Sequence, residues 1–313
     1  MFPLRIYPPA GKDPAGILRF FFPPKTNGFL GKQVEPWRRP FSSYSMKIIR
    51  YLDMGGKIRY GFDEPKKGVY QVTGDTLGHF QPTTRKAEVA KILAPVQPPF
   101  IFCIGLNYRK HAEEGGVPLP KFPVVFMKST GAVQNPDDPI VLPRALRSDK
   151  VDYECELAVV LGRGGKNIRE EDALEHVFGY TCANDVSARD WQNEWGGSQW
   201  CRGKTFDTFA PLGPCLVTKD EIPNPAGLGI RTYLNGEIMQ NSNTEDLIFS
   251  VPKLIAFLSG STTLPDGAVI LTGTPSGVGM AHKPPVWLKA GDRVEIEIDR
   301  IGRLGNPVVE EKA

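Results

Sequence analysis

Val151-Asp-Tyr-Glu-Cys-Glu-Leu-Ala-Val-Val-Leu161 alternates polar and apolar residues and then becomes wholly apolar. Successive side chains of a strand point to opposite faces, so a strand over 151–161 would carry Asp152, Glu154 and Glu156 on one face. Like charges on one face repel each other, and glutamate is a poor strand former. The pattern therefore predicts that this face either meets water or lies against a positive charge.

The stretches around it predict a domain made mostly of strands. Short apolar runs bounded by turn residues are expected to form strands at 101–108, 123–129, 139–143, 213–218, 230–240, 268–274 and 292–299. One clear helix is expected at 250–260, and a second is expected early in 170–185, leading into a strand. Strands outnumber helices and do not alternate with them, so we expect an α+β fold that is mostly β, with a mixed, mainly antiparallel core.

The first 45 residues differ in composition from the rest of the chain. They contain eight prolines, seven lysines or arginines and two acidic residues, without a strand or helix period. Such a segment is expected to be disordered on its own. We interpret residues 1–45 as an upstream extension, with the natural start at Met46, and keep an organelle transit peptide as the alternative.

Two further regions follow this segment. Residues 46–97 are expected to form a small N-terminal β domain, with a hairpin over 47–62, a strand over 67–74 and a short helix over 84–94. Residues 98–313 are expected to form the main, catalytic domain.

Overall composition is that of an ordinary globular protein, with 41% hydrophobic and 23% charged residues among 313. A net charge of +3 does not favour nucleic acid or an anionic membrane surface as a partner. No apolar run approaches the roughly 20 residues of a membrane span. Five cysteines without a CxxC pair predict reduced thiols in a cytoplasmic protein, or a mitochondrial one if residues 1–45 are a transit peptide.

The acidic residues suggest a metal site. Residues i and i+2 on one strand face lie about 7 Å apart, close enough for Glu154 and Glu156 to converge on one cation. Asp185, which follows a predicted strand, is the best third ligand for a hard ion such as Mg²⁺. For the two glutamates alone, a solvated strand face is the simpler interpretation.

Three other stretches carry candidate chemistry. His111 and Glu114 are three residues apart, so one helical turn would pair them as a general base. Lys204 could bind a substrate carboxylate, and the glycine-rich loop 272–280 would bring Thr274 and backbone N–H groups to a ligand. Taken singly, each stretch is better explained by a solvated or tight turn. The remaining histidines, His79, His176 and His282, have no evident partner in the sequence and are expected to be structural.

Five motifs occur in the order found in one superfamily: NYRKHAEE, VDYECELAVVLG, NDVSARDWQ, GKTFDTFAPLGP and LTGTPSGVG. From about Phe100 to the C-terminus the chain resembles the fumarylacetoacetate hydrolase superfamily. NTEDLIFSVPKLIAFLS and KPPVWLKAGDRVEIEI are most similar to the branch of domain-containing protein 2 and of bacterial acylpyruvate hydrolase-like proteins.

The resemblance implies a β-rich sandwich roll with a few helices, a homodimer, and Mg²⁺ or Mn²⁺ as cofactor. By position in the motifs it implies Glu154, Glu156 and Asp185 as metal ligands. It also implies catalytic roles for His111, Glu114 and Lys204 and substrate binding by Arg189, Gln192, Lys204 and Thr274.

The function that the resemblance implies is metal-dependent chemistry on a small 2-oxo acid, with no nucleic-acid or membrane partner. The first hypothesis is hydrolysis of a C–C bond in an acylpyruvate or other β-diketo acid, in which the His111–Glu114 pair activates water and an enolate leaves. The alternatives are oxaloacetate keto–enol tautomerisation or decarboxylation, or hydroxyheptadienedioate isomerisation, in the same site without water attack. A hypothesis of another class is a non-catalytic, metal-stabilised binding protein.

Overall fold

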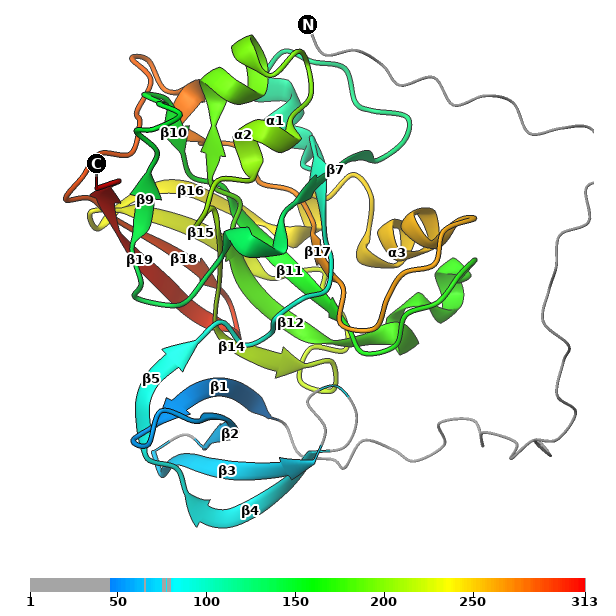
Figure 1. Cartoon of the computed structure of the whole chain (residues 1–313). Coiled ribbons are helices and arrows are strands. Elements are labelled where there is room, and N and C mark those ends of the chain that lie inside the picture. Colours follow the sequence, from blue (N-terminus) through cyan, green and yellow to red (C-terminus); the bar gives the residue numbers. More distant parts are fainter. Residues whose placement is uncertain (1–45, 65, 75–76, 78–79, 313) are drawn as a thin grey trace, which may run out of the picture. The chain divides into compact units, whose positions relative to one another are not determined.

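The computed structural model describes residues 46–64, 66–74, 77 and 80–312 (Figure 1). The predictions made for residues 1–45 lie outside these residues, and so does His79. The described part of the chain consists mostly of strands with few helices, which confirms the expected α+β, mostly β fold. None of its helices has the length and apolar character needed to cross a membrane.

Twelve of the described strands form one large sheet. Its main path runs β4-β3-β2-β1-β14-β12-β11-β17-β6-β7, with β5 paired to β1 and β8 paired to β14. The strands are β1 (Lys47–Asp53), β2 (Ile58–Glu64), β3 (Gly68–Gly74), β4 (Phe80–Lys86), β5 (Val89–Leu93), β6 (Ile101–Gly105), β7 (Val124–Lys128), β8 (Val133–Gln134), β11 (Cys155–Leu161), β12 (Val177–Asn184), β14 (Ala210–Thr218) and β17 (Val269–Leu271).

The centre of this sheet is β11 and β12, in which every residue is buried. Their sequences, CELAVVL and VFGYTCAN, are rich in apolar and β-branched residues, as expected of strands covered on both faces. The two strands are antiparallel, with Cys155 opposite Asn184 and Leu157 opposite Cys182. This register brings the residues just before β11 next to those just after β12.

A second sheet has the order β16-β15-β18-β19-β9, and a short pair joins β10 to β13. These strands are β9 (Ile140–Leu142), β10 (Val151–Asp152), β13 (Ser187–Ala188), β15 (Gly229–Leu234), β16 (Glu237–Asn243), β18 (Arg293–Ile298) and β19 (Gly302–Glu310). Most pairings of the described strands are antiparallel, while β17·β6, β14·β8 and β19·β9 are parallel, so the expected mixed sheet is confirmed.

Helical segments are short, and α3, with nine residues, is the longest of those described. They are α1 (Arg109–Glu114), α2 (Cys201–Lys204), α3 (Val251–Ser259), the π-helical turn η3 (Trp191–Trp195) and the 3-10 segments η1 (Thr130–Ala132), η2 (Glu170–His176), η4 (Thr244–Asp246) and η5 (Gly279–Ala281). The Ser250 side chain caps α3 by accepting from Lys253 N, and Pro252 lies in the first turn, so the helix expected at 250–260 is confirmed.

The helix predicted over 84–94 was wrong, because this segment forms the end of β4 and all of β5. Its alanine, lysine and glutamate residues favour a helix locally. In the fold, however, β5 pairs with β1, with Ile92 opposite Tyr51, and Leu93 becomes buried. Pairing with a neighbouring strand therefore overrides local propensity.

The continuous strand predicted over 151–161 is interrupted at Tyr153 and Glu154. The Asp152 carboxylate accepts a hydrogen bond from Tyr153 N at 2.8 Å, and Glu154 N donates to the Asn184 side chain at 3.0 Å. These side chains replace the backbone partners of a regular strand. Of the two environments expected for the acidic face, the structure bears out the positive charge: Asp152 and Glu154 are buried and form ion pairs with Arg189, and Glu154 also pairs with Lys204.

The proposed division of the chain near residue 97 stays a prediction. Across that division, β1 pairs with β14, with Lys47 opposite Val217 and Ile48 opposite Leu216. The described residues on both sides fall in one compact unit, so strands β1–β5 extend the sheet of the larger region (Figure 1).

Candidate active site

Three carboxylates converge where β11 and β12 meet. Glu154 directly precedes β11, Glu156 lies within it, and Asp185 directly follows β12. Asp185 N donates to Glu154 O at 2.9 Å, which fixes the two turns against each other. One oxygen of each of the three carboxylates lies within 4.8 Å of the others, and all three side chains are buried.

Two buried lysines contact these carboxylates. Lys204, at the end of α2, places Nζ 2.7 Å from Glu154 Oε2 and 2.9 Å from Asp185 Oδ2. Lys128, at the end of β7, forms an ion pair with Asp185 Oδ1 and donates to Val186 O at 3.0 Å. Burial lowers the pKa of Lys204, but Asp185 and Glu154 more than offset this and raise it above its ordinary value, which favours the ammonium form.

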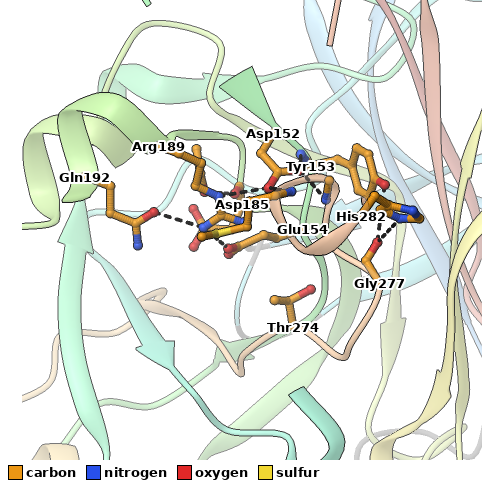
Figure 2. A network of polar contacts seen from close by, with 12 residues as sticks. Asp152, Tyr153, Glu154, Asp185, Arg189, Gln192, Thr274, Gly277 and His282 are labelled. Carbon is orange, nitrogen blue, oxygen red and sulfur yellow. Dashed lines mark hydrogen bonds and ion pairs between the residues drawn. The ribbon is translucent and has the colours of Figure 1, made fainter. Parts of the chain in front are cut away.

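Arg189 is the third buried cation, and Figure 2 shows it between Asp152 and Gln192. Its Nη1 lies 2.7 Å from Glu154 Oε1 and donates to Gln192 Oε1 at 2.9 Å. Its Nε donates to Asp152 Oδ2 at 2.9 Å. Burial opposes ionisation of Glu154, but Lys204 and Arg189 hold its pKa below the ordinary value.

Asp152 is part of the acidic face but is not one of the three converging carboxylates. It accepts from Gly279 N at 2.7 Å and from Met280 N at 3.0 Å, besides Arg189. Asp152 therefore holds the first two residues of η5 against β10.

Glu156 differs from its neighbours because it has no cationic partner among the described residues. Its Oε2 accepts from Gly273 N at 2.6 Å. Burial, followed by the charges of Asp185 and Glu154, raises the pKa of Glu156 well above its ordinary value. A buried carboxylate pushed toward its neutral form beside two others indicates a missing positive charge.

The donor set fits a hard divalent cation. Three carboxylate oxygens from three different backbone positions can occupy part of an octahedron and leave other positions for water or substrate. Glu154, Glu156 and Asp185 would therefore hold Mg²⁺ or Mn²⁺, and the ion would supply the positive charge that Glu156 lacks. Their convergence is the arrangement that the sequence spacing suggested.

The predicted acid–base pair forms at α1. His111 Nδ1 lies 3.2 Å from Glu114 Oε2, as one helical turn requires. Glu114 also accepts from Gly277 N, at 3.0 Å to Oε1 and 3.2 Å to Oε2. Burial would raise the pKa of Glu114, but His111 and the Gly277 N–H lower it below its ordinary value. Glu114 is therefore a carboxylate at neutral pH and can orient the His111 ring.

A cavity of about 290 Å³ joins the carboxylates to the acid–base pair. It brings together most of the predicted site residues, namely His111, Glu154, Glu156, Arg189, Gln192, Lys204 and Thr274. Glu114 and Asp185 do not line the cavity but contact the lining residues His111 and Lys204. The rest of the lining is mainly apolar and includes Val117, Phe126 and Trp200.

The side chains of two predicted site residues, Lys204 and Thr274, already form hydrogen bonds within the protein. Lys204 was expected to bind a substrate carboxylate, and in this structure its ammonium group is bonded to Glu154 and Asp185. Thr274 lines the cavity while its hydroxyl accepts from Gln240 Nε2 at 2.9 Å. The roles of all the site residues therefore remain proposals that rest on this geometry.

Sequence reasoning missed Lys128 and Asn107. Asn107 is fully buried and donates from Nδ2 to Thr272 O at 2.7 Å and to Phe249 O at 3.1 Å, which fixes the start of the glycine-rich loop. Lys128 ends an otherwise apolar strand, VVFMK, at a position on the same face as the buried Phe126. A lysine on the buried face of a strand is the signal that could have indicated it.

Comparison with known proteins places the chain in a family. The family model described as fumarylacetoacetate (FAA) hydrolase, C-terminal, matches residues 100–309. The chain belongs to the fumarylacetoacetate hydrolase family. This finding confirms the resemblance drawn from the five motifs and the β-rich roll that it implied.

Relatives within the family carry names of specific enzymes. The chain is 56% identical over 219 residues to "Oxaloacetate tautomerase fahd2, mitochondrial" of Xenopus laevis, covering 70% of this chain and 68% of that protein. It is 47% identical over 249 residues to "Oxaloacetate tautomerase FAHD2A, mitochondrial" of Homo sapiens, covering 79% and 78%. The chain is thus similar to family members named as tautomerases.

Solved structures of the family share the fold. A 2-hydroxyhepta-2,4-diene-1,7-dioate isomerase from Mycobacterium marinum aligns with a TM-score of 0.74 at 36% identity, covering 86% of this chain and all of that one. A fumarylacetoacetate hydrolase from Exiguobacterium antarcticum aligns with the same TM-score and identity over 85% of this chain and all of that one. Family membership therefore establishes an enzyme fold that is compatible with more than one reaction.

Proposed function

We propose that this protein is a divalent-metal-dependent oxaloacetate keto–enol tautomerase. The observation that carries the proposal is that the His111–Glu114 pair and the carboxylates Glu154 and Glu156 meet at one cavity. The names of the similar proteins from Xenopus laevis and Homo sapiens support the choice of reaction. We thereby favour the alternative of the sequence analysis over its first hypothesis, C–C bond hydrolysis.

The chain supplies both a cation site and a mobile proton. Bound Mg²⁺ or Mn²⁺ would act as a Lewis acid that polarises the 2-oxo group of the substrate. Arg189 and Lys204 add positive charge at the same end of the cavity, where they face the substrate carboxylate next to that group. Buried positive charge there stabilises the negative charge that develops on the enol oxygen.

His111 is the group that moves the proton in this proposal. Its ring lines the cavity, and Glu114 accepts from Nδ1, so Nε2 is left free to accept a proton. In the keto-to-enol direction, the ring takes a proton from C3 of oxaloacetate and then delivers it to the oxygen at C2, so the ring ends in its starting protonation state. In the reverse direction, the same ring returns the proton to C3.

Hydrolysis of an acylpyruvate is the second candidate, because a histidine backed by a carboxylate can equally activate water. The two reactions differ in their products. Purified protein with Mg²⁺ is given oxaloacetate, and enol absorbance and pyruvate are followed separately. Acetylpyruvate is tested in parallel, with pyruvate as the product measured.

Tautomerase activity predicts that enol absorbance relaxes faster with protein than without it, and that neither substrate yields pyruvate above the uncatalysed rate. Pyruvate from acetylpyruvate would instead establish hydrolysis, and pyruvate from oxaloacetate would establish decarboxylation. Loss of the effect on adding a chelator, with recovery on adding Mg²⁺ or Mn²⁺, tests the metal requirement and shows which ion is preferred.

We also propose a mitochondrial location and a homodimer. The location is supported by the names of the relatives from Xenopus laevis and Homo sapiens, which include the word mitochondrial. Cell fractionation tests it, and recovery in the cytosol alone would contradict it. The homodimer follows from the family resemblance, and light scattering of purified protein tests it.

A further inference from the structure

Gly277 connects the His111–Glu114 pair to two side chains that the proposed reaction does not use. Its N–H faces Glu114, as described above. Its carbonyl accepts from the Tyr153 hydroxyl at 3.2 Å and lies 3.3 Å from His282 Nε2. Figure 2 shows the His282 ring directed at the Gly277 carbonyl, with Tyr153 beside it. Gly277 therefore has polar contacts at both its N–H and its carbonyl.

The conformation of Gly277 requires glycine. Its φ is +94°, in the left-handed region, and a Cβ there would lie 2.2 Å from the Met239 carbonyl oxygen. Glycine rotates about its backbone bonds more freely than other residues, so its orientation must be fixed by its surroundings. The contacts of its carbonyl with Tyr153 and His282 therefore restrain this position together with the bonds from its N–H to Glu114.

The carbonyl and the N–H of Gly277 flank the same α-carbon. They lie in adjacent peptide planes and can turn separately, but the bonds to the carbonyl restrain the loop segment that also carries the N–H. Without these bonds the segment samples more conformations, and the N–H meets Glu114 less often. Glu114 would then keep His111 as its partner but lose its anchor on the loop, and α1 would no longer be fixed over the cavity. The Gly277 N–H is one of the groups that lower the pKa of Glu114 against the effect of burial, so its loss would also weaken the carboxylate as an orienting group.

We propose that Tyr153 and His282 are positioning residues for the His111–Glu114 pair and act through the backbone of Gly277. Because a carbonyl oxygen only accepts, His282 carries a proton on Nε2 in this contact. The inference rests on the proposed function in one respect, the role of His111 in moving the proton. It changes the assignment of His282, which the sequence alone suggested was structural.

The test compares a variant that removes the donor with one that keeps it. His282→Leu removes the donor, His282→Gln keeps an N–H at the end of a side chain of similar reach, and Tyr153→Phe removes the hydroxyl alone. His176→Leu is the matched control. Its Nδ1 contacts the carbonyls of Arg163 and Gly164 at 3.0 and 3.1 Å, in a loop that does not line the cavity.

Two measurements are made on the full chain with saturating Mg²⁺. The first is kcat and KM for oxaloacetate tautomerisation, and the second is hydrogen–deuterium exchange of the amides over 107–118. We expect His282→Leu and Tyr153→Phe each to lower kcat about fivefold, the size expected for one net hydrogen bond, with KM changed less than twofold. Exchange over 107–118 should rise by a similar factor, while His282→Gln and His176→Leu stay near the wild type in both measurements.

Wild-type kcat and wild-type exchange in the double variant Tyr153→Phe/His282→Leu would overturn the proposal. Equal impairment of His282→Gln and His282→Leu would also overturn it, because the donor would then be irrelevant. If the wild-type protein does not act on oxaloacetate, the proposed function fails, whereas the exchange measurement still decides the positioning role. Because Tyr153 adjoins Glu154, the His282 variants decide the matter if Tyr153→Phe also weakens Mg²⁺ binding.

Discussion

Glu156 and Asp185 direct carboxylate oxygens to within 4.8 Å of each other in the buried centre of the protein, yet only Asp185 is paired with lysines. Two buried carboxylates at this separation repel each other strongly in a medium of low polarity. A divalent cation between them and Glu154 turns that repulsion into attraction. The first prediction follows from this relationship.

Mg²⁺ should stabilise the wild-type protein and should not stabilise Glu156→Gln. Gln at this position can still accept from Gly273 N, so the variant removes a charge and keeps the hydrogen bond. Without metal, Glu156→Gln should melt at a higher temperature than the wild type, because the folded state no longer has to protonate this carboxyl group or hold its charge. Differential scanning calorimetry with and without Mg²⁺ checks both effects, and Glu194→Gln at an exposed ion pair is the control. An equal rise of Tm with Mg²⁺ in wild type and Glu156→Gln would contradict the prediction.

The pH dependence of metal binding should reflect Glu156. Its pKa is raised in the folded protein, chiefly by burial, so the folded state binds a proton more tightly than the unfolded state. Without metal, stability from this group is fully present below the ordinary carboxyl range and is lost as pH rises toward the raised pKa. Mg²⁺ must displace that proton, so its affinity should increase about tenfold per pH unit over the same window. Calorimetric titration at several pH values measures this slope, and a flat profile would contradict the assignment.

Removal of the Lys128 charge should destabilise the protein without metal. Lys128→Met leaves the side of Asp185 that faces β7 without its cation, and breaking a fully buried pair of this kind costs about 3–5 kcal/mol. Mg²⁺ should recover part of the loss, so the increase of Tm on adding Mg²⁺ should be larger in Lys128→Met than in the wild type. Lys91→Met, at the partly exposed pair with Asp138, is the matched control and should cost less than about 1 kcal/mol. Equal destabilisation by the two substitutions would show that Lys128 has no special role.

His111→Ala should reduce turnover of oxaloacetate by roughly 10²–10⁴-fold, the range for loss of a general base. Glu114→Gln should reduce it less, because the amide oxygen can still accept from the ring while the charge is lost. Neither substitution should weaken Mg²⁺ binding by more than about twofold, since neither residue belongs to the carboxylate triad. Steady-state kinetics combined with a metal titration separates the two effects. Retention of wild-type kcat by His111→Ala would rule out its role in proton transfer.

Local sequence was sufficient for the parts of the site that lie on one element. The i, i+3 spacing of His111 and Glu114 predicts their contact directly, and the spacing of Glu154 and Glu156 with Asp185 after a strand suggests their convergence. The interruption of the strand at Tyr153 and Glu154 was not predictable, because Glu154 N bonds to the side chain of Asn184, 30 residues away. The same holds for β5, whose partner β1 outweighs its helix propensity.

Long-range contacts also explain why two polar residues were missed. Lys128 meets Asp185 across 57 residues of sequence, and Asn107 donates to Phe249 and Thr272, which are 142 and 165 residues away. Neither the hydrophobic period of the sequence nor the spacing of its polar residues indicates such contacts. The five motifs specify the family, whereas the polar groups that support the site become visible only in the folded chain.

The most direct test of the central claim is a crystal structure of the protein grown with Mn²⁺, with anomalous diffraction measured at the manganese edge. We predict one strong anomalous peak per chain, about 2.0–2.3 Å from one carboxylate oxygen each of Glu154, Glu156 and Asp185. If crystals grown at a Mn²⁺ concentration that supports activity show no peak among these three side chains, the account is contradicted.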